Sequence, residues 1–191
     1  VANGLTDNDG NGIQTPLIIG KTRNHAVPWY VQTPLTATNI VGILSATDAF
    51  YDPGYNHWND THPTTSVFSV GGYMADHADL TNPSTKIVYC FANVEGYSKV
   101  GTYEGNGNAN GSYVHCGFRP AWILLKDIDS AADWQMYDNK RYAFNRSAYT
   151  NVLEANNTGA ETTTVNELDL LSNGFKLRST NTYSNANNKT F

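Results

Sequence analysis

The chain has 191 residues, of which 40% are hydrophobic and 15% charged, and its formal net charge is −5. This acidic balance argues against a nucleic-acid partner, because binding phosphates needs clustered lysine and arginine. No apolar run reaches the roughly 18 residues that cross a bilayer, so we expect no membrane insertion. Low charge combined with many β-branched and aromatic residues predicts an all-β globular protein.

Short strand-forming runs alternate with turn sequences such as Asn-Gly and Asp-Pro-Gly along the whole chain. This pattern predicts a β-sandwich or jelly-roll-like fold. Two helical turns are expected, near Ser130–Asp133 and near Tyr149–Ala155. The expected strands are Leu17–Lys21, Trp29–Thr33, Ile40–Ser45, Ser66–Val70, Ile87–Ala92, Ser98–Tyr103, Tyr113–Phe118, Ala121–Asp127, Trp134–Tyr137, Leu168–Leu171 and Phe175–Arg178.

The two halves of the chain resemble each other, which indicates an internal repeat. The first two landmarks are 105 positions apart and the last two 103 apart. We therefore predict two tandem related modules, residues 1–96 and 97–191. The landmarks, in chain order, are Lys21 with Lys126, Trp29 with Trp134, Ser69–Gly71 with Ser172–Gly174, and Lys86 with Lys189.

The repeat implies incomplete modules at both ends. Lys86 opens the apolar strand Ile87–Ala92, whereas Lys189 is followed by Thr190 and Phe191 alone. We expect the second module to lack its closing strand and the first its opening strand. We favour a window on a longer polypeptide; the alternative is that a neighbouring subunit supplies the strand.

The two cysteines have neither CxxC nor zinc-site spacing. Each lies in an apolar, strand-like run, Cys90 in IVYCF and Cys116 in YVHCGF. We expect two buried thiols, with a disulfide between them as the alternative.

Asp7, Asp9 and Asn11 stand at alternating positions before Gly12, as in the first half of a calcium-binding loop. The twelfth position of such a loop needs Glu, and Ile18 stands there. We favour an Asx-rich turn and expect no cofactor, with calcium as the alternative.

A second polar cluster combines His57, Asp60 and His62, residue types that bind zinc or nickel. Their spacing fits a loop and not one helix face, so we favour a structured loop over a metal site.

The same segment has the composition of a sugar-binding loop, since sugar rings stack on aromatic side chains while polar neighbours bind hydroxyls. A host-surface glycan is therefore one expected partner, and an aromatic-pinned loop is the favoured alternative. Trp29, Trp122 and Trp134 are instead expected in the core. The candidate glycan-binding residues are Tyr51, Tyr55, Asn56, Trp58, Asn59 and Asp60.

Enzyme chemistry has little support, because the chain lacks GxSxG, HExxH and GxxxxGK[ST] motifs. We expect no enzyme and assign no catalytic residue. A polysaccharide hydrolase is the third function considered, and it would need two carboxylates flanking a sugar. The chain has five glutamates for this role: Glu95, Glu104, Glu154, Glu161 and Glu167.

Long ordered motifs carry a family resemblance: VEGYSKVGTYEGNG at 94–107, GFRPAWILLK at 117–126 and LDLLSNGFKLRS at 168–179, with related runs at 58–71 and 86–99. They resemble a β-rich repeat domain of unknown function found in tail-fibre-like and other virion structural proteins of marine bacteriophages. Residues 1–15 lie outside this resemblance. It implies a phage structural protein (a fibre, horn or head-decoration element) at the virion surface or outside the cell. The expected partners are further copies of itself and other virion proteins.

Overall fold

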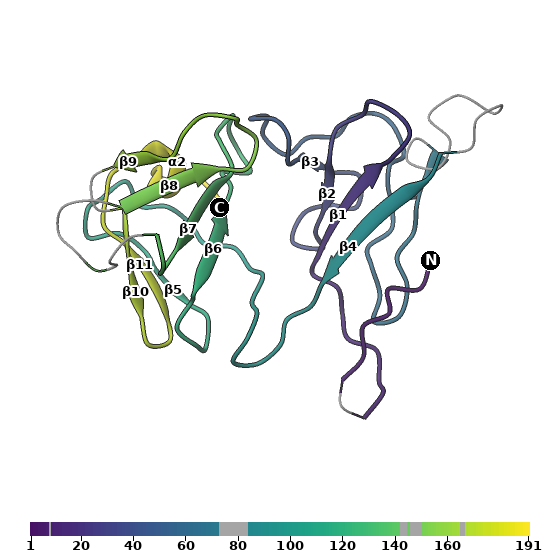
Figure 1. The fold of residues 1–191 in the computed structure, drawn as a ribbon, viewed down its shortest axis with the longest axis horizontal. Helices are drawn as coiled ribbons and strands as arrows, with labels where there is room; N and C mark the ends of the chain where they lie inside the picture. Colours follow the sequence, from purple (N-terminus) through teal and green to yellow (C-terminus); the bar gives the residue numbers. More distant parts are fainter. Residues whose placement is uncertain (8, 73–83, 142–144, 146–149, 165–166) are drawn as a thin grey trace. The chain divides into compact units, whose positions relative to one another are not determined.

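The protein is all-β and sandwich-like, as the sequence predicts. The computed structural model describes residues 1–191 apart from 8, 73–83, 142–144, 146–149 and 165–166. The described residues form three antiparallel sheets and one short helix, α2 (Thr182–Asn185) (Figure 1). None of their helices is long and apolar enough to cross a membrane.

The chain separates into two compact units. Unit 1 comprises Val1–Leu44, Phe50–Val94 and Ser98–Gly101. Unit 2 comprises Ser45–Ala49, Glu95–Tyr97 and Thr102–Phe191.

Unit 1 is built on one four-stranded sheet with the order β3-β2-β1-β4. The central strand β1 pairs along its whole length with β4, from Leu17 opposite Phe91 to Thr22 opposite Lys86. Ile18 and Val31 on the central strands are fully buried, and the register places them on opposite faces, so the middle of the sheet is covered on both sides. The strands are β1 (Leu17–Thr22), β2 (Tyr30–Gln32), β3 (Gly42–Ile43) and β4 (Lys86–Phe91).

The rest of the interior of unit 1 is filled by irregular chain. Trp58 and Phe68 are buried there, with 1% and 5% of their surface exposed. The Phe68 N–H donates to the Val1 carbonyl, and Ala2 forms an isolated bridge with Val67. The strand expected at Ser66–Val70 is therefore wrong beyond this single bridge.

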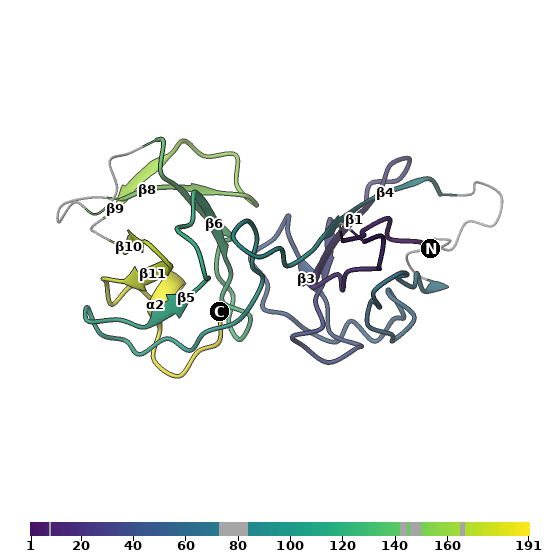
Figure 2. The same cartoon turned by 90° about the horizontal axis from the view of Figure 1, so that it is seen from below.

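Unit 2 is a sandwich of two sheets, ordered β10-β11-β5 and β6-β7-β8-β9 (Figures 1 and 2). Its core takes residues from both: Ile123, Leu125, Tyr137 and Val152 from one, and Leu168, Leu170, Phe175 and Leu177 from the other. The strands are β5 (Tyr113–His115), β6 (Trp122–Leu125), β7 (Gln135–Asp138), β8 (Thr150–Glu154), β9 (Thr162–Thr164), β10 (Leu168–Leu171) and β11 (Gly174–Leu177).

Four further local predictions are wrong. Thr150–Glu154 is strand β8 and not a helical turn, because it pairs with β7 and β9. Ser130–Asp133 is irregular; the Asp127 carboxylate accepts from the backbone N–H groups of residues 129 and 130 there. No strand forms at Ser98–Tyr103 beyond a bridge at Ser98. Trp122 is 56% exposed and lies outside the core.

The repeat is visible as identical hydrogen bonds in the two units. The Lys21 ammonium donates to the carbonyls of residues 25 and 27, four and six positions on. The Lys126 ammonium donates to residues 130 and 132 at the same spacing, and also to Thr47. Each lysine thus closes the turn that leads to the next strand, and Trp29 and Trp134 directly precede that strand.

A second pair of contacts shows which segments correspond at the far end of the repeat. The Arg23 N–H donates to the Thr85 carbonyl at 2.7 Å, and the Ile128 N–H donates to the Thr190 carbonyl at 3.0 Å. The Thr85 N–H in turn donates to the Asn24 side chain, as the Thr190 N–H does to Asp129. The three corresponding pairs, Arg23 with Ile128, Asn24 with Asp129 and Thr85 with Thr190, are each 105 positions apart, so Phe191, and not Lys189, corresponds to Lys86.

The Ser-x-Gly landmark does not correspond either. Ser172 and Asn173 form the tight turn between β10 and β11, where Leu171 pairs with Gly174. Ser69–Gly71 instead lies in irregular chain of unit 1. The landmarks offset by 103 are therefore coincidences of sequence.

Candidate functional sites

The loop of residues 51–62 is fixed to unit 1 by two buried side chains. Trp58 is 1% exposed, and the His57 ring packs on Tyr30 with ring centroids 4.4 Å apart. The Gln32 side-chain amide donates to the Thr61 carbonyl at 2.9 Å. The loop therefore has a defined shape, since its anchors cannot leave the interior without exposing apolar area.

The outer face of this loop carries the remaining candidate glycan-binding residues. Tyr55 is 63% exposed and Tyr51 is 39% exposed. Asn56, Asn59 and Asp60 are also exposed. The placement of Trp58 in the glycan-binding set is wrong, because its buried indole presents no face to a sugar.

His57, Asp60 and His62 are not gathered as metal ligands. No cluster of three or more His, Cys, Asp or Glu side chains suited to a metal occurs in the described parts of the chain. His57 Nδ1 lies 3.1 Å from the Tyr55 carbonyl. Burial lowers the pKa of His57, although this hydrogen bond opposes the shift, so a neutral ring is favoured in the interior.

The segment that resembles half a calcium loop is a tight hairpin turn. Asp7 Oδ1 accepts from the N–H groups of Asp9 and Asn11, at 2.9 and 2.8 Å, and the Asn11 side chain donates to Oδ2. The hydrogen bonds from Asn11 hold the pKa of Asp7 below its ordinary value. Asp7 thus acts as the cap of an Asx turn, while Asp9 and Asn11 are exposed.

Unit 2 contains a fully buried carboxylate that the sequence does not single out. Glu167 is 0% exposed, and its carboxylate accepts from Ser179, Asn181 and Ser184 at 2.6–2.9 Å. This network joins the start of β10 to helix α2. Serine and asparagine are so common in this chain that their spacing carries no warning of the site.

The other glutamate contacts described in unit 2 lie nearer the surface. The Arg141 guanidinium binds Asp138 at 2.5 Å and Glu161 at 2.8 Å. Burial alone would raise the pKa of Asp138, but the hydrogen bonds from Arg141 lower it below its ordinary value. Glu154 accepts from the Asn157 side chain. These carboxylates hold turns and strand ends together, which is a structural role.

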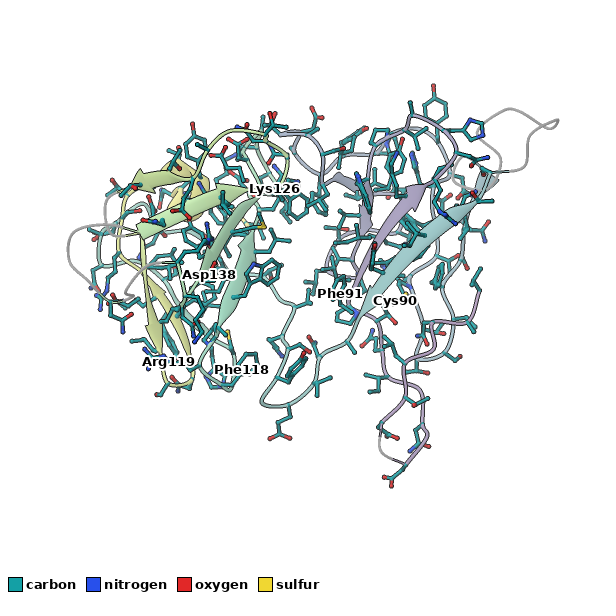
Figure 3. The ribbon with its side chains drawn as sticks, in the orientation of Figure 1. Cys90, Phe91, Phe118, Arg119, Lys126 and Asp138 are labelled. Atoms are coloured by element: carbon teal, nitrogen blue, oxygen red, sulfur yellow. The ribbon has the colours of Figure 1, made fainter. Side chains whose placement is uncertain are left out.

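Strand β4 exposes an apolar stripe. Ile87, Tyr89 and Phe91 alternate along it with 37%, 45% and 44% of their surface exposed. Tyr89 stacks on Trp29 with centroids 6.3 Å apart. Cys90, the neighbour of Phe91 in the chain, is one of the alternate residues of β4 that are half-buried (Figure 3). The alternation gives β4 one apolar surface that the described chain leaves open to solvent.

Both cysteines are free and half-buried, so no disulfide links Cys90 to Cys116. Burial raises the pKa of the Cys90 thiol. A raised pKa keeps this sulfur protonated and less reactive at neutral pH.

These features define an all-β protein of two related units, of which unit 1 carries both an exposed polar and aromatic loop and the apolar strand β4. The chain belongs to a family described as a domain of unknown function, DUF7483, whose model matches residues 2–191. The matched region includes residues 2–15. No curated protein matches the chain significantly. No solved structure does so either.

Proposed function

We propose that the protein is a structural component of a phage virion: a fibre, horn or head-decoration element that assembles into an extended oligomeric surface appendage. The main support is the repeated framework, because modules with the same internal contacts extend an assembly without new design. The second support is the resemblance of the sequence motifs to those of virion repeat domains. The proposal includes no catalytic activity.

The stripe on β4 supports assembly. Edge strands of proteins that stay monomeric usually carry lysine, proline or a bulge that blocks pairing. The exposed positions of β4 are instead Ile87, Tyr89 and Phe91. An exposed apolar edge strand is suited to contacts between copies.

The test is the mass of the purified protein in solution, with electron microscopy of the assemblies. We expect oligomers or filaments, and we expect Tyr89→Lys with Phe91→Lys to shift them toward monomer. Tyr97→Lys is the matched control, because Tyr97 is 81% exposed and lies outside β4. A wild-type protein that stays monomeric at about 100 µM, where even weak interfaces associate, would contradict the oligomeric role.

Placement on a virion needs a second measurement. We expect mass spectrometry of purified particles from a phage that encodes this chain to find its peptides at structural copy number. Their absence from such particles would reject the virion assignment whatever the oligomeric state.

A second candidate function is glycan binding by the loop of residues 51–62. The supporting observation is Tyr55, 63% exposed beside exposed Asn56 on a loop anchored by Trp58. On a glycan array we expect Tyr55→Ala to abolish any binding and Tyr97→Ala to leave it unchanged. Equal loss in both variants, or no binding by the wild type, would reject this function.

A further inference from the structure

The edge of β6 in unit 2 corresponds to an edge that is covered in unit 1. In unit 1, β1 pairs with β2 on one side and with β4 on the other. In unit 2, β6 pairs with β7, and within the described residues no strand lies on its other side. Since β6 follows β1 by 105 positions and is followed directly by Lys126, the counterpart of Lys21, the covered edge of β1 shows what fits the bare edge of β6.

The backbone register supports this correspondence. The Arg23–Thr85 hydrogen bond lies one residue beyond the Thr22–Lys86 end of the β1–β4 ladder. The Ile128–Thr190 hydrogen bond occupies the same place in unit 2. In an antiparallel ladder the groups that face one neighbour alternate along the strand. Lys126, Leu124 and Trp122 therefore turn their backbone groups toward the same side as Ile128, which is the bare side.

The side chains along this edge are also those of a strand meant to be paired. Trp122 is 56% exposed, whereas its counterpart Leu17 is half-buried opposite Phe91. The sequence Trp122–Leu125 contains no charge or proline that would discourage pairing. Lys126 is 5% exposed and its ammonium is occupied by three carbonyls, so it does not protect the edge.

We propose that the bare edge of β6 is an acceptor site for one added β-strand with the pattern of β4, contributed by a further module of the same kind. The added strand runs antiparallel to β6, enters beside Thr190 and brings an apolar side chain over Trp122, as Phe91 does opposite Leu17. Main-chain hydrogen bonds supply affinity and alternate side chains supply specificity, as in other cases of strand addition. The inference does not depend on the virion assignment, because it follows from the geometry of the repeat.

The first test adds the strand in trans. A peptide with the sequence of residues 85–92, carrying Cys90→Ser, is titrated into the full chain, and amide hydrogen exchange is measured. We expect the amides of Trp122 and Leu124 to be protected about tenfold or more, with β1 unaffected. The control peptide also carries Tyr89→Pro, which removes an N–H that faces the partner strand, since Tyr89 lies opposite Ile19 in the phase of the Arg23–Thr85 hydrogen bond, and it should not protect.

The second test removes the affinity limit. The sequence of Ile87–Phe91, with Cys90→Ser, is fused directly after Phe191, where tethering gives a high effective concentration. We expect the β6 amides to gain the same protection and Trp122 fluorescence to shift to the blue, a shift that Trp122→Phe abolishes. The matched fusion with Tyr89→Pro should show neither change.

Two outcomes overturn the proposal. One is a fusion whose β6 protection equals that of its proline control. The other is a free chain whose Trp122 and Leu124 amides are already protected to the same extent at every concentration, since the edge of β6 would then be covered by the chain itself.

Discussion

Unit 1 completes its interior with irregular chain around Trp58 and Phe68, whereas unit 2 completes it with the second sheet β10-β11-β5. Both units share the strand, the lysine-closed turn and the following tryptophan. The comparison teaches that this framework specifies one layer only. The second layer can be formed by any segment that packs large apolar side chains against the sheet, because the hydrophobic effect is not directional.

Substitutions in the second layers of the two units should therefore destabilise the units separately. The largest loss of stability is expected at Trp58. Trp58→Ala removes a buried indole and should lower the free energy of unfolding of unit 1 by about 3–5 kcal/mol. Amide exchange should rise at Val31 and Val41, which are buried in unit 1, and not at Ile123 of unit 2.

Trp122→Ala is the matched control in the other unit. Trp122 is 56% exposed, so its loss should change stability by about 0.5 kcal/mol or less. Equal costs at the two positions would mean that Trp58 is not what closes unit 1.

The corresponding break in unit 2 is Glu167→Gln. In the wild type three side-chain donors face the Glu167 carboxylate, whereas in the variant one of its oxygens is replaced by an NH₂ group that cannot accept from them. We therefore expect the free energy of unfolding in urea to fall by about 2–3 kcal/mol. Glu161→Gln serves as the control, since Glu161 lies near the surface and should cost about 1 kcal/mol or less. Unchanged exchange at α2 in the Glu167 variant would show that the network does not hold the helix.

The shared lysines give a direct comparison of the two frameworks. Lys126→Met leaves three carbonyls without their donor, whereas Lys21→Met leaves two and lies at a half-buried position. We expect losses of about 2–3 and about 1 kcal/mol, respectively, by thermal unfolding. A larger loss of stability for Lys21→Met than for Lys126→Met would contradict the correspondence between the two turns.

The smallest effect is a difference in alkaline stability between the units. Burial raises the pKa of Tyr103 and Tyr137 in unit 2, and the nearby Glu167 adds to the shift. The stability gained by keeping these phenols protonated is complete below about pH 10, the ordinary value, and is lost as pH rises toward the folded-state values. Burial lowers the pKa of Lys126, which opposes this loss because unfolding then takes up a proton.

Stopped-flow absorbance at 295 nm tests this balance. We expect two tyrosines to ionise only with the unfolding of unit 2, after those of unit 1 that are exposed. Tyr103→Phe should reduce the alkaline loss, at the cost of its hydrogen bond to the Ser184 carbonyl. Rapid ionisation of every tyrosine before unfolding would contradict the assignment.

Strands built on apolar runs next to clear turns could be predicted from the sequence, and so could the correspondence of Lys21 with Lys126. The polar strands β8 and β9 could not, because Thr150–Glu154 and Thr162–Thr164 have no apolar alternation and form by pairing with neighbours. For the candidate site, the loop around Tyr55 could be found by its composition, but the direction of Trp58 could not. Aromatic residues in a polar loop serve equally as anchors and as contacts, and only the packing distinguishes the two.

What the sequence alone determined is the all-β class and the lysine-closed turns, since each depends on residues close together in the chain, and the tandem framework, since the same local pattern recurs 105 positions later. The tertiary structure decided the second layer of each unit, the burial of Trp58 and Glu167, the exposure of Trp122, and which residue corresponds to Lys86. Those features depend on contacts between segments far apart in the chain, such as Ile128 with Thr190 and Glu167 with Ser184. Local sequence carries no record of a distant partner, so only the folded chain fixes them.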